Sequence, residues 1–84
     1  MKKHVKITLR LTNSLESDRT VVLEPWSGEY TLRPGKAFDI VAEGDPTSRL
    51  EIELSNERVI VYSFASVDAQ LSIFQDGNEI LTSE

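Results

Sequence analysis

Few side chains in this chain of 84 residues are able to do catalytic or metal chemistry. The chain has one histidine, His4, and no cysteine. A serine or cysteine nucleophile needs a neighbouring base, and His4 lies on the polar side of an alternating run near the amino terminus. Copper and zinc sites draw on several His and Cys ligands. We therefore expect no catalytic, cofactor-binding or metal-binding residues, and a protein that is not an enzyme.

Carboxylates are the remaining reactive groups, with 14 Asp and Glu against 9 Lys and Arg. Glu51 and Glu53 are two residues apart, a spacing that places both side chains on one face of a strand. Glycosidases and calcium sites also use clustered carboxylates, but no Asp-rich calcium loop accompanies this pair. A solvated strand face is the simpler explanation. Asp76-Gly77-Asn78 likewise predicts a tight turn of the backbone rather than a calcium loop.

The net charge of -5 disfavours a phosphate-binding surface, so nucleic acid is not an expected partner. No run approaches the roughly 20 apolar residues of a membrane-spanning helix, and charges interrupt the basic start of the chain. We expect no membrane contact and a cytoplasmic location. Basic residues are concentrated in the first ten positions, and none follows Arg58. Attraction between neighbouring strands explains this asymmetry, and a basic arm for an anionic partner is the alternative.

Alternating apolar and polar residues identify the elements that must position any site. Such runs, β-branched or period-two in pattern, cover 5–12, 20–24, 29–33, 38–43, 50–54, 58–64, 70–75 and 78–82. Pro34-Gly35 favours a type II turn, and Asp76-Gly77 favours a two-residue hairpin. The chain therefore predicts one all-β domain over 1–84, a small antiparallel β-sandwich or partly open barrel of about seven strands. Immunoglobulin-like, cupredoxin-like and jelly-roll-like windings all remain open.

The run 58–64 is apolar on both of its faces. A two-residue loop at Asn56-Glu57 pairs it with the run 50–54 and sets Glu51 opposite Tyr62. In this register Leu50, Ile52, Leu54, Val59 and Val61 form the core side. Ile60, Tyr62 and Phe64 then point the other way, so either the chain itself covers them or a partner does. These three residues are the candidate protein interface, with a second copy of the chain as the expected partner.

Trp26 and Tyr30 flank Gly28 and form a candidate platform for a sugar ring or another small ligand. The alternative is a structural role in which Trp26, with Pro25 beside it, caps one end of the sandwich.

Several of these segments resemble a set of short uncharacterised bacterial all-β proteins. The likeness rests on Leu23-Glu24-Pro25-Trp26, on Glu29 to Gly35, on Val59 to Tyr62 and on Phe74 to Glu79, and follows a pattern of the type LEPWG-x-x-Y-x-L-x-PG. This chain departs from it with Ser27 after the tryptophan and the glycine at position 28. The resemblance implies a bacterial β-domain and no activity.

Taken together, these features predict a non-enzymatic domain that works through protein contacts or self-association, without a cofactor. A carbohydrate-binding or small-ligand module that uses Trp26 and Tyr30 is the alternative. An acidic immunity or inhibitor protein, which would neutralise a basic toxin by charge complementarity, is a third class.

Overall fold

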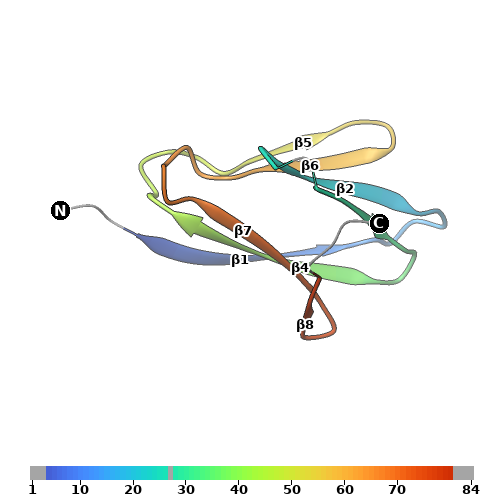
Figure 1. Ribbon diagram of the computed structural model, residues 1–84. Helices are drawn as coiled ribbons and strands as arrows, with labels where there is room; N and C mark the ends of the chain where they lie inside the picture. Colours follow the sequence, from blue (N-terminus) through green and yellow to red (C-terminus); the bar gives the residue numbers. More distant parts are fainter. Residues whose placement is uncertain (1–3, 27, 81–84) are drawn as a thin grey trace.

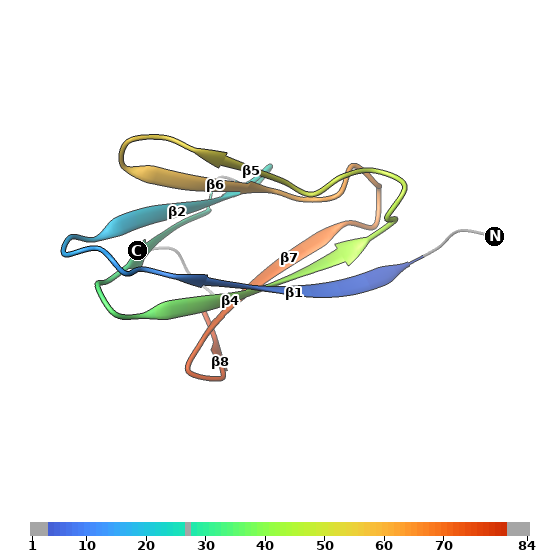
Figure 2. The same cartoon turned by 180° about the vertical axis from the view of Figure 1, so that it is seen from behind.

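Two β-sheets stack face to face in the computed structural model, which describes residues 4–26 and 28–80 (Figures 1 and 2). The described residues form no helix, and hence none long and apolar enough to cross a membrane. The predicted small all-β sandwich is confirmed, and the described residues form eight strands. The strands are β1 (Val5–Thr12), β2 (Arg19–Glu24), β3 (Gly28–Leu32), β4 (Ala37–Gly44), β5 (Glu51–Leu54), β6 (Arg58–Tyr62), β7 (Gln70–Gln75) and β8 (Asn78–Glu79).

The sheets have the strand orders β1-β4-β7-β8, here called sheet A, and β3-β2-β6-β5, called sheet B. Five strand pairings in the described chain are antiparallel, as predicted. The sixth, between β2 and β6, is parallel, with Val22 opposite Ile60 and Glu24 opposite Tyr62. Alternation along a strand carries no information on which distant strand lies beside it, so this pairing was not predictable from the pattern.

The core lies between the sheets and consists of large aliphatic and aromatic side chains from both layers. Its fully buried members are Val21, Leu23, Leu32, Phe38, Ile40, Val61 and Ile73. Tyr30 packs against this cluster, with its ring edge-on to Phe38 at a centroid distance of 6.4 Å and an interplanar angle of 78°. Because these side chains alternate along their strands, the residues between them lie on the outer faces.

The predicted turns are present. Gly35 has a φ of 77°, and the Lys36 N–H donates to the Arg33 carbonyl at 3.1 Å, as a Pro-Gly turn requires. Asp76 and Gly77 both have positive φ, 53° and 80°, which is the signature of a type I′ hairpin. The hairpin of β5 and β6 closes with the Ser55 N–H donating to the Arg58 carbonyl at 3.0 Å. Its register pairs Glu51 with Tyr62, as predicted.

The burial predicted for β5 is wrong. Ile52 and Leu54 lie on the core side, opposite Val61 and Val59, yet they are 44% and 76% exposed. Leu50, just before the strand, is half-buried. Strand β5 is the edge of sheet B, and the facing sheet does not cover its inner side. Period-two alternation identifies the inward face of a strand, but it does not show whether anything covers that face.

The connections that follow β2 and β6 each have one further feature. The peptide bond between Glu24 and Pro25 is cis, directly after β2. Ser27, between β2 and β3, lies outside the described residues. The segment 64–70 contains a single turn, closed by the Ala69 N–H donating to the Ser66 carbonyl at 3.1 Å.

Candidate interaction surfaces

The outer face of sheet B carries four glutamates around an apolar centre, and we call it the Glu-rich face. The register across the sheet places Glu29 beside Val22, Val22 beside Ile60, and Ile60 beside Glu53. The next row runs from Glu24 through Tyr62 to Glu51. The Glu-rich face therefore consists of Ile60 and Tyr62 with Glu24, Glu29, Glu51 and Glu53, above Val22, which is only 6% exposed. Arg58, at one end, is the one cation among the described residues of these strands that shares their outward register.

Tyr62 lies in the negative field of this face. Its hydroxyl donates to Glu53 Oε1 at 2.9 Å. This hydrogen bond is the main reason that the pKa of Tyr62 is raised above its ordinary value of 10.0, and partial desolvation adds to the shift. The charges of Glu51 and Glu24 also raise the pKa of Tyr62. Three carboxylates thus act on one phenol, which makes the centre of the face unfavourable for anions and favourable for cations.

The structure separates the three residues of the predicted interface. Ile60 and Tyr62 are half-buried on the Glu-rich face. Phe64 is only 4% exposed, so the chain itself covers it, and it is not part of a free surface. It lies beyond the end of β6 and packs close to Gly44, where an added Cβ would lie 2.9 Å from the Cβ of Phe64. The strand ends at Tyr62 rather than continuing to 64, so outward alternation does not extend to Phe64.

Trp26 and Tyr30, the predicted ligand platform, line one shallow hollow of about 350 Å³, together with Gln70 and Leu71. Trp26 is half-exposed, whereas Tyr30 is half-buried against the core. Trp26 also lines a second hollow, of about 570 Å³, with Tyr62 and Val67. The indole therefore lies between two hollows, and one of them reaches the edge of the Glu-rich face.

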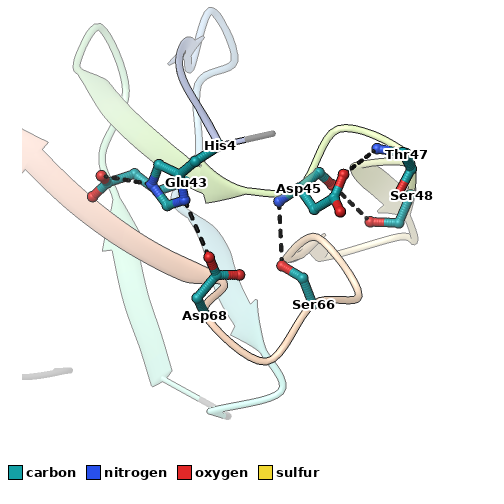
Figure 3. Close-up of polar contacts among 7 residues, drawn as sticks. All are labelled: His4, Glu43, Asp45, Thr47, Ser48, Ser66 and Asp68. Atoms are coloured by element: carbon teal, nitrogen blue, oxygen red, sulfur yellow. Dashed lines mark hydrogen bonds and ion pairs between the residues drawn. The ribbon is translucent and has the colours of Figure 1, made fainter. Parts of the chain in front are cut away.

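A polar cluster joins the start of β1 to the loop before β7 (Figure 3). His4 Nε2 lies 3.6 Å from Glu43 Oε1, and His4 Nδ1 lies 3.3 Å from Asp68 Oδ2. The two carboxylates meet different ring nitrogens, so they do not converge on a common point. No group of three His, Cys, Asp or Glu residues within 4–26 and 28–80 is arranged to hold a metal ion. The role of this polar cluster is structural, because it links the start of β1 to β4 and to the loop before β7.

An ion pair between neighbouring strands is formed by Arg10. Its guanidinium donates two hydrogen bonds to Asp39, from Nε at 2.9 Å and from Nη2 at 3.1 Å. The hydrogen bond from Arg10 holds the pKa of Asp39 below its usual value. The pair joins β1 to β4 on the outer face of sheet A.

Comparison of the chain with protein-family models, with curated proteins and with solved structures finds no match. The candidate surfaces are therefore interpreted from their own geometry. The hairpin register predicts Glu51 and Glu53 beside Ile60 and Tyr62, as the structure has them, but the sequence pattern gives no indication that Glu24 and Glu29 belong to the same face. Both join it through β2, whose parallel pairing with β6 left no local signal.

Proposed function

We propose that this protein is a non-enzymatic binding module whose Glu-rich face docks a basic surface of another protein. The observation that carries the proposal is the arrangement on sheet B, where Ile60 and Tyr62 are half-buried and four glutamates surround them. An apolar centre with a charged rim is the usual anatomy of a protein interface. The rim carries four glutamates against one cation, Arg58, so its net negative charge would attract a cationic partner and repel an identical face on a second copy.

A defined probe tests this face. The probe is a synthetic peptide of lysines and leucines, and its matched control carries glutamate in place of each lysine. We expect the lysine peptide to bind, with affinity that falls as salt is raised, and to shift the amide resonances of Val22, Ile60 and Tyr62. Binding by both peptides alike, or resonance shifts confined to other strands, would contradict the proposal.

Variants separate the face from the overall negative charge of the protein. Glu53→Gln should weaken binding of the lysine peptide by about 0.2–1 kcal/mol, the usual contribution of an exposed ion pair. The matched control is Glu79→Gln, which removes the same charge from β8 in the other sheet. Ile60→Ser should also weaken binding if the apolar centre takes part, and circular dichroism checks that this variant is folded. Equal losses for Glu53→Gln and Glu79→Gln would point to a non-specific charge effect.

A second candidate function, binding of a sugar or other small ring, is favoured by the position of Trp26. Its half-exposed indole borders two hollows, of which one also contains Tyr30. Trp26 is the only tryptophan, so any change of tryptophan fluorescence reports on this site. Titration with a glycan panel should then alter its emission. Unchanged tryptophan fluorescence with every glycan in the panel would remove this candidate.

A further inference from the structure

On one side of the sandwich, both sheets have an edge strand. Strand β1 is the edge of sheet A, and β5 is the edge of sheet B. A hollow of about 260 Å³ at the end of the sandwich is lined by Leu11 from β1 and by Leu54 from β5, and it extends to Leu32 of β3. Figures 1 and 2 show these strands in the two separate layers.

Apolar side chains on this open side point inward without being covered. Ile7 pairs with buried Ala42 of β4, so it faces the core, and yet it is 42% exposed. Ile52 and Leu54 are exposed in the same way on the opposite layer. Leu15, from the loop after β1, also lines the hollow and is exposed. Four of the six large exposed hydrophobic residues in the described chain are thus gathered along one side, which marks it as a surface for association.

The backbones of β1 and β5 are also incomplete as sheet members. Each is hydrogen-bonded to one neighbouring strand within the described residues, β1 to β4 and β5 to β6. The outward N–H and C=O groups of an edge strand are available to pair with another strand. A strand placed beside either edge would therefore gain main-chain hydrogen bonds and would cover the apolar side chains.

The outer sides of the two edges carry opposite charge. On β1, Lys6 and Arg10 alternate with the inward apolar residues, and there is no carboxylate in this strand. On β5, the outward residues are Glu51 and Glu53. Arg10 is already paired with Asp39 of β4, so Lys6 is the β1 cation that can meet Glu51 or Glu53 of a neighbouring β5. The edge strand of sheet A is therefore complementary in charge to the edge strand of sheet B.

We propose that two copies of this chain associate through their open sides, with β1 of each copy beside β5 of the other. A two-fold axis parallel to the strands gives this arrangement, because it exchanges the two layers. In each layer of the dimer, sheet A of one copy then lies edge to edge with sheet B of the other. The other two-fold arrangement would place β1 beside β1 and β5 beside β5. It would set Glu51 and Glu53 against their own copies, so charge selects the first arrangement.

Sedimentation velocity of the full chain over roughly 1–500 µM tests the association. We expect a dimer that forms with rising concentration. Leu54→Asp should weaken it at least about tenfold, because a carboxylate would be buried in an apolar contact. Val67→Asp is the matched control, since Val67 is 96% exposed and lies in the loop after β6 rather than on the open side. It should leave the dimer unchanged. A monomer throughout the range, or equal loss in both variants, would overturn the proposal.

Charge exchange and cross-linking test the arrangement of the strands. Lys6→Glu alone and Glu53→Lys alone should each weaken the dimer, and the double variant should recover it. Because the chain contains no cysteine, Thr8→Cys and Glu53→Cys each introduce a single thiol. A short thiol-reactive cross-linker should join these two variants to each other when they are mixed. Efficient joining of Thr8→Cys to itself, with no mixed product, would overturn the pairing of β1 with β5.

Discussion

Asn13 is a buried polar residue whose side chain links the loop after β1 to the end of β3. Its Nδ2 donates to the carbonyls of Ser17 and Leu32, both at 2.9 Å, and its Oδ1 accepts from the Leu15 N–H at 2.8 Å. Its backbone also exchanges hydrogen bonds with the Pro-Gly turn, where the Gly35 N–H donates to the Asn13 carbonyl at 2.8 Å. The bond to Leu32 joins residues 19 positions apart, so the alternation pattern carries no signal for it.

Asn13→Ala should lower the free energy of unfolding by about 2–4 kcal/mol, since it leaves two carbonyls and one N–H without their side-chain partner. Urea denaturation followed by circular dichroism measures this change. Ser14→Ala, at the exposed next position, is the control and should stay within about 0.5 kcal/mol of the parent. Similar losses for the two variants would mean that the bonds of Asn13 are not what stabilises the loop.

Asp68 belongs to the polar cluster in Figure 3, and hydrogen bonds lower the pKa of its carboxyl group. A hydrogen bond from Ser66 is the main reason that the pKa of Asp68 is below its ordinary value of 3.8, and a hydrogen bond from His4 acts in the same direction. A lowered carboxyl pKa means that the ionised form favours the folded state. This contribution to stability is present above the ordinary pKa and is lost as the pH falls through the lowered value.

Ser66→Ala should therefore raise the pKa of Asp68 toward 3.8, because the largest hydrogen bond to the carboxylate is removed. Carboxyl carbon chemical shifts, followed through an acid titration by NMR, give the pKa directly. Asp39 provides an internal control, because its pKa is held low by Arg10 and should not move. An unchanged Asp68 pKa in the variant would show that Ser66 does not stabilise this carboxylate.

At the scale of the elements, two positions require glycine for different physical reasons. Gly44 ends β4 against the loop before β7, and a Cβ there would lie 2.9 Å from Phe64 Cβ and 3.0 Å from Ser66 Oγ. Gly35 has open space around it but a φ of 77°, a region that L-residues seldom occupy. Gly44 is limited by packing and also by its positive φ of 156°, whereas Gly35 is limited by backbone conformation alone.

Substitution by alanine and by asparagine should separate these causes. Gly35→Ala should cost about 1–2 kcal/mol, and Gly35→Asn less, because asparagine tolerates the left-handed conformation. Gly44→Ala should cost about 1–3 kcal/mol through overpacking together with the positive φ at this position, and the larger Gly44→Asn should cost more. Thermal unfolding of the four variants gives the comparison. The opposite order at Gly44, with asparagine better tolerated than alanine, would contradict a packing limit.

Elements were predictable where the determining contacts are local. Pro34-Gly35 and Asp76-Gly77 fix their turns through the conformations that these residues allow, and the loop length at Asn56-Glu57 fixes the register of β5 and β6. Exposure was not predictable in the same way. Leu54 alternates like a core residue, but whether it is covered depends on where the facing sheet ends.

At the scale of the whole molecule, the sandwich class followed from the spacing of short strands and turns, and the arrangement of strands did not. The partners β1–β4, β2–β6 and β4–β7 are joined by contacts across long stretches of chain. The candidate site was predicted to the extent that it lies on one hairpin, with Ile60 and Tyr62 beside Glu51 and Glu53. Its other half depends on β2, which only the folded sheet brings alongside.

The parallel pairing of β2 with β6 also has a consequence for how the chain folds. Three hairpins, β2–β3, β5–β6 and β7–β8, join strands that follow each other in sequence and close with short loops. Sheet B is complete only when two of these hairpins dock, which brings Val21 to Val59 and Leu23 to Val61. Closing such long loops costs entropy before the core contacts repay it, so we expect this docking rather than hairpin formation to limit the folding rate, on the millisecond-to-second scale typical of β-sandwiches.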